Sequence, residues 1–457
     1  MTTSTPPSSP PAKPRGAFVD RRAFVGLDVP SLVDLQNCIH CGFCLPSCPT
    51  YVATGQELES PRGRLHLIRG VLDGRVDASD RMLGHLDLCL QCRACETACP
   101  SGVPYGRIME DARASIMARG PTRRPASWSL RSLLLRQVIA RPRVLRAALA
   151  PLRLYARSGL QRLVRGRLPR ALASIEARMP VPKGRPFRRR GTLSSPEAPV
   201  ARVALLTGCV HGELTPSMHE STVRVLARLG REVVAPPAQG CCGALHAHAG
   251  DVEAARDLAR RNIEVFEATG VEAVIVNAAG CGAAMKEYGR LLRHDPAWAQ
   301  RAERFASTVR DVLEYVATIE GFEAGLGPLD GTGGTDGTVG VTLQDACHLA
   351  HAQGIREAPR RLLGAIPGLR LREMRTPDRC CGSAGLYSLV QPAMSRAVLE
   401  AKMDDVEGTG AAYVCTSNPG CTIQLESGVR ARGLDASVLH VIELLDASYR
   451  AGDASTR

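Results

Sequence analysis

A run of four cysteines followed by proline constrains this chain more than any other feature. Cysteines occupy positions 38, 41, 44 and 48 before Pro49, and the same spacing returns at positions 89, 92, 95 and 99 before Pro100. In proteins with two cubane clusters, the three closely spaced cysteines of a run bind one cluster and the fourth binds the other. The sequence therefore predicts two 4Fe-4S clusters, one held by Cys38, Cys41, Cys44 and Cys99, and one held by Cys89, Cys92, Cys95 and Cys48.

Two structural zinc knuckles are the alternative reading of these runs, because a single Cys-x-x-Cys pair often binds zinc. Recurrence of the complete run with its trailing proline favours iron-sulfur clusters instead. His40 lies within the first run and is a candidate for tuning a nearby cluster.

Most of the remaining cysteines form a second repeat. The chain has 457 residues and 17 cysteines. In one copy the first cysteine precedes a Cys-Cys-Gly triplet by 32 residues, and in the other by 33. The last cysteine follows the pair by 39 and 40 residues. Near-equal offsets indicate an internal repeat with four cysteines per copy: Cys209, Cys241, Cys242 and Cys281, then Cys347, Cys380, Cys381 and Cys421.

The alternation of short apolar runs with helical spacing in this second half predicts α/β domains. Short apolar runs at 203–206, 232–235 and 273–276 alternate with helical spacing at 218–229 and 252–269. Runs at 341–344, 369–374 and 412–416 repeat the pattern. The cysteines follow these strands, at the sheet edge where α/β proteins bind ligands. We expect one of four outcomes there: a further iron-sulfur cluster, a zinc ion, a redox thiol site, or inert buried cysteines.

We predict an α+β and α/β protein, in which a helical dicluster ferredoxin module precedes two tandem α/β cysteine-rich (CCG) domains. A disordered tail rich in proline, serine and threonine, without a signal peptide, is expected before the module. The predicted divisions are 1–30 for the tail, 31–120 for the dicluster module, 121–199 for an Arg-rich helical linker, 200–326 for the first cysteine-rich domain, 327–339 for a flexible linker and 340–450 for the second cysteine-rich domain.

The formal charge of +13 is concentrated in one segment. Residues 121–190 hold 18 arginines and Lys183 against Glu176, so the rest of the chain carries −5. Prolines at 142, 151, 169 and 180 are expected to divide the segment into short amphipathic helices. A solvated linker is favoured, and a surface for anionic lipid or an acidic partner is the second interpretation. Nucleic acid is not an expected partner, because aromatics are few and no binding module is recognised.

Location follows from the same composition. Reduced cysteines in this number indicate a cytoplasmic protein. No stretch of 18 or more apolar residues is present, so membrane contact is expected only as peripheral association at the inner face of the cell membrane.

The complete set of motifs resembles the glycolate oxidase iron-sulfur subunit family. The resemblance covers residues 31–118 and 200–446, and rests on the cysteine runs, on Ser60-Pro61-Arg62-Gly63-Arg64, on residues 100–107 and on the two Cys-Cys-Gly repeats. It implies a complex in which flavin-containing (FAD) partner subunits oxidise glycolate and this subunit passes electrons to a respiratory acceptor, a quinone or a carrier. Related repeats occur in heterodisulfide reductases and anaerobic glycerol-3-phosphate dehydrogenases. The alternatives are therefore a subunit of a related lactate or glycerol-3-phosphate dehydrogenase, or a heterodisulfide-reductase-like thiol redox protein.

One departure bears on the repeats. Their fullest form ends in Cys-x-x-Cys, but Ala278 and Asn418 stand where the first of those cysteines belongs. This weighs against a five-cysteine noncubane cluster and leaves a four-cysteine site or no metal. The chain also has no dinucleotide-binding glycine motif after a strand. We expect no catalytic residues for substrate oxidation in this subunit alone, with FAD confined to partners.

Overall fold

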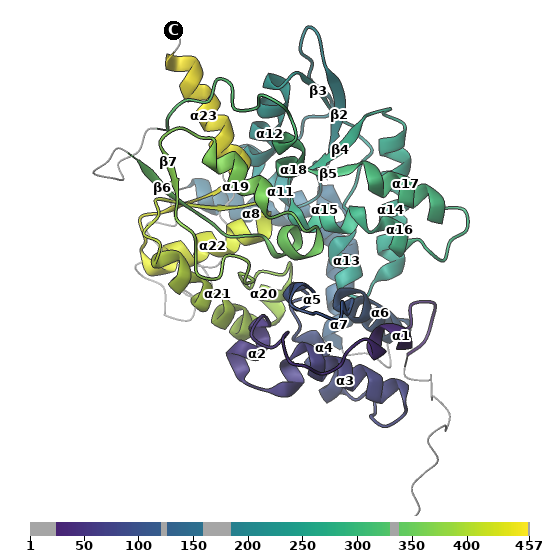
Figure 1. Cartoon of the computed structure of the whole chain (residues 1–457). Coiled ribbons are helices and arrows are strands. Elements are labelled where there is room, and N and C mark those ends of the chain that lie inside the picture. Colours follow the sequence, from purple (N-terminus) through teal and green to yellow (C-terminus); the bar gives the residue numbers. More distant parts are fainter. Residues whose placement is uncertain (1–23, 120–125, 159–183, 330–337, 456–457) are drawn as a thin grey trace, which may run out of the picture.

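The computed structural model describes residues 24–119, 126–158, 184–329 and 338–455. A helical N-terminal module lies against two α/β units, which sit side by side above it in Figure 1. The fold is thus helical at its start and mixed α/β after residue 190, as the repeat pattern predicts.

Short helices, and no strands among its described residues, make up the N-terminal module, because two cysteine runs interrupt regular structure. Pro61 begins the longest inserted helix, and the Ser60 hydroxyl accepts a hydrogen bond from the Gly63 amide at 3.0 Å, which caps that helix. The fully buried Ile68, Leu86 and Ile108 form the core of the module. Its elements are α1 (Leu32–Gln36), α2 (Pro49–Thr54), η1 (Glu57–Glu59), α3 (Pro61–Leu72), α4 (Asp80–Asp87), α5 (Ala94–Thr97) and α6 (Tyr105–Ala118).

Residues 24–30, which the sequence assigns to the tail, are packed against the protein. Phe24 is 2% exposed within the core of the module. The buried Asp28 carboxylate accepts a hydrogen bond from Arg256 Nη2 at 2.7 Å, so this segment joins the module to the first repeat. The rest of the predicted tail, residues 1–23, lies outside the described residues.

Residues 126–158 of the Arg-rich segment are helical and consist of α7 (Ala126–Leu134), the π-helical turn η3 (Leu135–Ile139) and α8 (Pro142–Arg157). Its described residues 184–199 are not helical, and they contain the strand β1 (Gly191–Ser194), which pairs with the first repeat. Trp128 is buried in the core of the N-terminal module. The predicted break at Pro151 is wrong, because α8 continues through it. Pro151 removes one backbone hydrogen bond, and on this exposed face water can replace it. Pro169 and Pro180 both lie within residues 159–183, which fall outside the described residues.

The first repeat is a five-stranded sheet in the order β1-β3-β2-β4-β5, parallel except for β1. β1 and β5 were not predicted, since each is very short. The strands are β1 (Gly191–Ser194), β2 (Ala201–Leu205), β3 (Arg231–Ala235), β4 (Ala273–Val276) and β5 (Val309–Asp311). The helices are α11 (His211–Leu214), α12 (Pro216–Arg228), α13 (Ala244–His248), α14 (Val252–Glu267), α15 (Ala279–Lys286), α16 (Tyr288–Leu291), α17 (Ala299–Thr308) and α18 (Val312–Ala317).

The second repeat copies this topology with a parallel sheet in the order β7-β6-β8-β9. Of its strands, β9 was not predicted, and β7 is shorter than the predicted 369–374. The elements are β6 (Val339–Leu343), η4 (His348–Ala352), α19 (Glu357–Gly364), β7 (Leu369–Leu371), α20 (Tyr387–Val390), α21 (Pro392–Glu407), β8 (Tyr413–Thr416), α22 (Pro419–Arg432), β9 (Ser437–His440) and α23 (Val441–Ser455).

The two repeats are fused through one hydrophobic core that contains buried residues of both sheets, such as Val203 and Val341. The two repeats meet directly after their third parallel strands, β4 and β8. There the Ala279 amide donates a hydrogen bond to the Ser417 carbonyl at 3.0 Å. The cysteine-bearing ends of the two sheets therefore lie near each other. Within the described residues, no helix combines the length and apolar character that a membrane crossing requires.

Candidate functional site

The first predicted cluster set surrounds one cavity. Cys38, Cys41, Cys44 and Cys99 line a hollow of about 410 Å³ that includes space open to solvent. Cys41 is exposed, whereas burial raises the pKa of Cys44 to about 11. His40 also lines the hollow, in a left-handed conformation with φ 56°. Cys95 of the second predicted set also lines this hollow, so five thiols from two distant runs face a common space near the surface.

The second predicted set lies deeper. Cys48, Cys89, Cys92 and Cys95 are each 7% or 8% exposed. Burial raises the pKa of Cys95, and the neighbouring Cys92, Cys89 and Cys48 thiols raise it further. These four sulfurs are therefore close enough to interact electrostatically.

Hydrogen-bond donors surround the second set. The backbone amide of Gln91 donates to Cys89 Sγ at 3.4 Å, and the Tyr105 hydroxyl donates to the same sulfur at 3.6 Å. Thr50 Oγ1 lies 3.2 Å from Cys48 Sγ. Such donors stabilise negative charge on sulfur and would raise the reduction potential of a bound cluster.

Arg64 is a site residue that the sequence argument missed. It is fully buried, its Nη2 pairs with Glu59 Oε2 at 2.7 Å, and its charge acts on the Cys89 and Cys48 thiols. A buried cation beside a thiolate set favours the more reduced, more negative state of a bound cluster. The Ser60-to-Arg64 motif was the available signal, but sequence alone suggested only a turn at this point.

The cysteines of the first repeat converge after β2, β3 and β4. Cys209 Sγ lies 3.5 Å from Cys241 Sγ, and Cys242 Sγ lies 3.1 Å from Cys281 Sγ. Hydrogen bonds from Cys209 and Cys242 lower the pKa of Cys241, whereas the hydrogen bond to Cys241 raises the pKa of Cys209. One thiol of this set therefore ionises in preference to its neighbours.

The cysteines of the second repeat converge in the same way. Hydrogen bonding to Cys380 raises the pKa of Cys347. The Cys380 hydrogen bond lowers the pKa of Cys381, but the hydrogen bond to Cys421 and burial outweigh it, so the pKa is raised. Asn418, which replaces a thiolate of the full motif, donates from Nδ2 to Cys421 Sγ at 3.6 Å. The remaining cysteine, Cys415, is buried on β8 and opposite Leu343.

The N-terminal module meets the second repeat through sulfur. Cys92 and Cys380 lie in one buried cluster, and the interaction with Cys380 together with burial raises the pKa of Cys92 well above its usual value. Apolar groups close around the contact, including Leu90 and Val398. Tyr387 of the second repeat donates to the Leu88 carbonyl at 2.8 Å, which fixes the two surfaces together.

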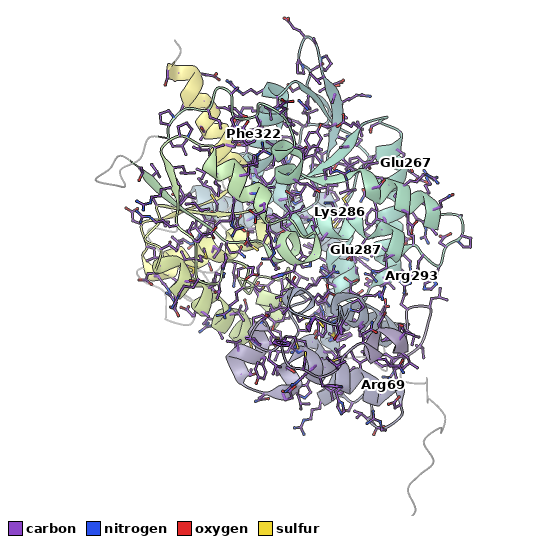
Figure 2. The ribbon with its side chains drawn as sticks, viewed as in Figure 1. Arg69, Glu267, Lys286, Glu287, Arg293 and Phe322 are labelled. Carbon is purple, nitrogen blue, oxygen red and sulfur yellow. The ribbon has the colours of Figure 1, made fainter. Side chains whose placement is uncertain are left out.

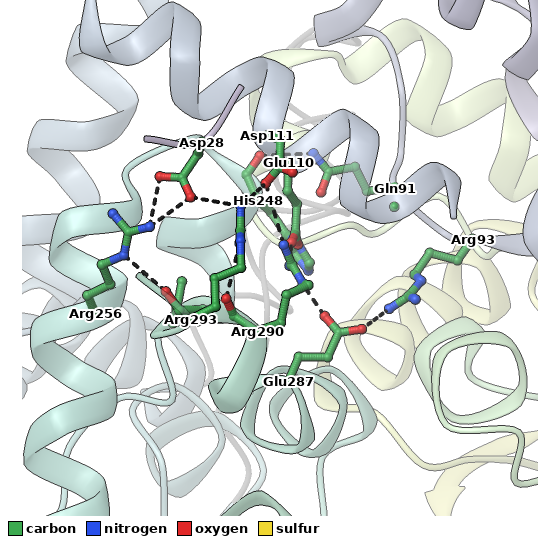
Figure 3. Close-up of polar contacts among 12 residues, drawn as sticks. Asp28, Gln91, Arg93, Glu110, Asp111, His248, Arg256, Glu287, Arg290 and Arg293 are labelled. Atoms are coloured by element: carbon green, nitrogen blue, oxygen red, sulfur yellow. Dashed lines mark hydrogen bonds and ion pairs between the residues drawn. The ribbon is translucent and has the colours of Figure 1, made fainter. Parts of the chain in front are cut away.

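Charged side chains join the module to the first repeat (Figure 3). Glu110 pairs with Arg290 and with His248 Nδ1, the latter at 2.9 Å. Arg93 Nη1 bonds Glu287 Oε1 at 2.5 Å. Figure 2 shows Glu287 and Arg293 on the side of the first repeat that faces the module. This network fixes the module against the first repeat. Because Arg93 directly follows Cys92 in sequence, the same short segment of the module contacts both repeats.

The donor sets suit thiolate-bound metal. Among the described residues, no three His, Cys, Asp or Glu side chains already stand in an arrangement that would hold a metal ion. The thiols nevertheless gather in groups of four and are free of disulfides. Soft sulfur donors in such numbers fit iron-sulfur clusters or zinc.

Family models match these same parts of the chain. A 4Fe-4S dicluster domain model matches residues 34–103, and a cysteine-rich domain model matches 203–286 and 341–426. The fold and the cysteine groups thus define an iron-sulfur protein with a dicluster module and two cysteine-rich domains. A third model, the linker region of the glycolate oxidase iron-sulfur subunit, matches residues 129–179.

Curated relatives narrow this class to a family. A probable glycolate oxidase iron-sulfur subunit of Bacillus subtilis is 39% identical over 90% of this chain and 93% of the relative. The glycolate oxidase iron-sulfur subunit of Escherichia coli is 35% identical over the same shares. The chain belongs to the family of glycolate oxidase iron-sulfur subunits.

Two more distant similarities were found. Lactate utilization protein A 2 of Bacillus mycoides is 30% identical over 54% of this chain and 98% of that protein. The crystal structure of a hypothetical protein from Helicobacter pylori aligns with a TM-score of 0.41 and 11% identity, covering 65% of this chain and 59% of that one.

Proposed function

We propose that this chain relays electrons in a glycolate-oxidising complex, from a flavin-containing partner subunit that oxidises the 2-hydroxy acid to a respiratory acceptor. The family membership and the names of the two full-length relatives support the complex and its substrate. The main support for an electron relay is the contact between Cys92 and Cys380, because it joins a predicted cluster ligand to the cysteines of the second repeat.

Two 4Fe-4S clusters would occupy the N-terminal module, the first bound by Cys38, Cys41, Cys44 and Cys99 and the second by Cys89, Cys92, Cys95 and Cys48. For the repeats we propose iron-sulfur centres in preference to zinc. Zinc has no redox chemistry, so a zinc site at Cys380 would end the relay where the two cysteine groups touch.

For the organisation of the chain, we propose the division into module 31–120, linker 121–199, and repeats 200–326 and 340–450. Hydrophobic clusters that separate the module from the first repeat support the boundary between those two units. Phe24 and Trp128 pack into the module from outside its bounds, and β1 at the end of the linker joins the sheet of the first repeat. Arg141 and Arg143 of the linker are exposed and would attract an acidic partner subunit or an anionic membrane surface. Arg131 and Arg153 are already paired with Asp87 and Glu213 of the chain itself.

Anaerobic purification with iron and zinc quantitation and electron paramagnetic resonance tests the cofactors. About eight irons per chain correspond to two cubanes alone. Clearly more iron, lost in part when Cys380 and Cys381 are replaced by serine, is the expected result. Zinc in place of the additional iron would overturn the redox assignment of the repeats.

Reconstitution tests the place of the chain in the complex. The purified subunit alone should not oxidise glycolate, and addition of its flavin-containing partner should reduce its clusters when glycolate is supplied. Turnover of glycolate by the subunit alone would contradict the relay. Reduction by lactate but not by glycolate would assign the chain to a lactate-oxidising complex instead, the substrate class that the Bacillus mycoides relative suggests.

A thiol-disulfide catalyst is the second candidate, and the close sulfur pairs of the first repeat favour it. Cys242 Sγ and Cys281 Sγ are 3.1 Å apart, and Cys241 has a lowered pKa that favours the nucleophilic thiolate. If this function holds, replacing Cys241 should abolish disulfide turnover and leave both module clusters intact. A metal-loaded first repeat without free thiols would exclude it.

A further inference from the structure

The loop between α1 and α2 exposes two large apolar side chains within the first cysteine run. Ile39 is 70% exposed and Phe43 is 65% exposed, on either side of Cys41 in the sequence. All 17 cysteines lie within the described residues, and Cys41 alone is exposed. Single exposed apolar residues are ordinary on protein surfaces. These two flank the exposed thiol of the surface cluster, the name used here for the cluster proposed at Cys38, Cys41, Cys44 and Cys99.

Contacts behind the loop fix its conformation. His40, with φ 56°, and Gly42, with φ 90°, both adopt left-handed conformations. Arg62 Nη1 donates to the His40 carbonyl at 3.1 Å, and an added Cβ on Gly42 would lie 3.0 Å from the same nitrogen. The Leu45 amide donates to the Gly42 carbonyl at 2.9 Å and closes a turn around Phe43. The exposed apolar side chains therefore belong to a preformed surface, and such surfaces bind with a smaller entropic cost.

The stretch that forms this surface lacks charged side chains. Residues 35–56 contain no Asp, Glu, Lys or Arg, in a chain in which 23% of residues are charged. The charges that bound the stretch are already paired, Asp34 with Arg107 and Glu57 with Arg62. Among the described residues that line the hollow beside the loop, Arg62 is the only charged one. Depletion of charge together with exposed aromatic and aliphatic side chains is typical of the centre of a protein–protein interface.

A second exposed apolar surface has the opposite character. Val144 and Leu154 of α8 are 41% and 71% exposed. Residues 142–157 include four arginines and no acidic residue, a combination that attracts anionic lipid. Arg153 pairs with Glu213, so α8 lies against the first repeat. A surface suited to a membrane is thus found beside the repeats, whereas the surface around the first cysteine run suits an uncharged protein face.

We propose that the surface formed by Ile39, Cys41 and Phe43 is the docking site of the flavin-containing partner subunit, which presents an uncharged apolar face beside its flavin. This rests on the proposed relay. Each turnover converts a 2-hydroxy acid to a 2-oxo acid with loss of two electrons and two protons. The flavin passes the electrons to the surface cluster one at a time, and the protons leave to water. The second cysteine set is buried and touches the second repeat, so electrons that enter at the surface cluster continue inward.

Binding of the purified flavin-containing subunit to the whole chain, purified anaerobically with its clusters, tests the site. Phe43→Glu places a charge within the apolar surface and should weaken binding at least about tenfold. Phe43→Leu keeps the surface apolar and should retain most of the affinity. Val200→Glu is the matched control and should bind as the wild type does, because Val200 is 77% exposed and precedes β2, at the sheet edge opposite the cysteines. The wild-type affinity should change little with salt, since the surface is uncharged.

Two further measurements separate docking from damage to the cluster, because Phe43 adjoins Cys44. Iron content and the spectrum of the dithionite-reduced surface cluster should be the same in Phe43→Glu and the wild type. Hydrogen exchange needs no variant: the partner should slow exchange of the amides of residues 36–46 in the wild-type chain.

The outcomes distinguish this site from the proposed function. Equal reduction of wild type and Phe43→Glu by the partner with glycolate, or protection of other amides only, would overturn the docking site and leave the relay intact. Loss of binding to phosphatidylglycerol vesicles in Phe43→Glu, with partner binding retained, would make this face a membrane surface instead. A homodimer that Phe43→Glu dissociates would assign it to a second copy of the chain. Protection of residues 36–46 without any reduction of the clusters by glycolate would support the docking site and overturn the relay.

Discussion

The Cys92 thiol of the N-terminal module and Cys380 of the second repeat lie in one buried cluster, across nearly 300 residues of sequence. Each residue belongs to a separate group of four cysteines. Contact between them makes the cysteines of the second repeat immediate neighbours of the module's deeper cysteine set. A direct route of electron transfer between the two groups is expected.

Replacing Cys380 should interrupt this route. In Cys380→Ser the module clusters should be reduced at the wild-type rate, while the centre of the second repeat is lost or reduced at least tenfold more slowly. Freeze-quench spectroscopy with a chemical reductant measures both. Cys415→Ala removes another buried thiol of the same repeat and serves as the control, because Cys415 packs in the sheet core. Equal slowing in both variants would argue against a specific route.

The interleaved ligand assignment predicts which cluster each fourth cysteine supports. Cys48→Ala should lose the buried cluster and leave the surface one, which a chelator removes quickly because Cys41 is exposed. Cys99→Ala should do the reverse and leave a chelator-resistant cluster. Iron content and the rate of chelator bleaching are the measurements. The opposite pairing of variant and resistance would show that each run binds its own cluster.

Glu110 should contribute strongly to the docking of the module on the first repeat. Burial raises its pKa, but Arg290 and His248 outweigh burial, so the pKa is lowered and the carboxylate stays charged. Glu110→Gln leaves Arg290 with more distant partners and should lower the unfolding free energy by about 3 kcal/mol. Glu57→Gln is the control: it breaks the exposed pair with Arg62, which should change stability far less, because solvent screens an exposed pair. Denaturant titration of both variants compares them.

Asp311 should make stability fall as the pH rises. It caps α18 by accepting from the Leu313 amide at 2.9 Å, and burial raises its pKa from 3.8 to about 7. Between those values the folded state binds a proton that the unfolded state releases. Stability should therefore fall by at most about 1.4 kcal/mol per pH unit from about pH 4 to 7.

Asp311→Asn removes this ionisation and keeps a capping side chain. Its melting temperature relative to the wild type should rise between pH 4 and 7 and then stay constant. A difference that does not change with pH would mean that the carboxyl titrates normally.

Much of the fold could be predicted from repeated local patterns in the sequence. Cysteine spacing, the turn before Pro61 and the strand runs at 203–206 and 273–276 all depend on neighbours a few residues away, and so they predicted the helical module and the two α/β repeats. Strands β1, β5 and β9 were missed because each is short and contains polar residues, unlike the equally short but wholly apolar β4. Their place in the sheets depends on pairing with distant strands.

Only the tertiary structure decided what lies between the repeated units. The contact of Cys92 with Cys380 and the buried Arg64 beside the second cysteine set each join segments through packing that no local motif encodes. The sequence alone determined which thiols could bind metal, because ligand spacing is local. Which groups touch depended on how the module and the two sheets bury their surfaces against one another.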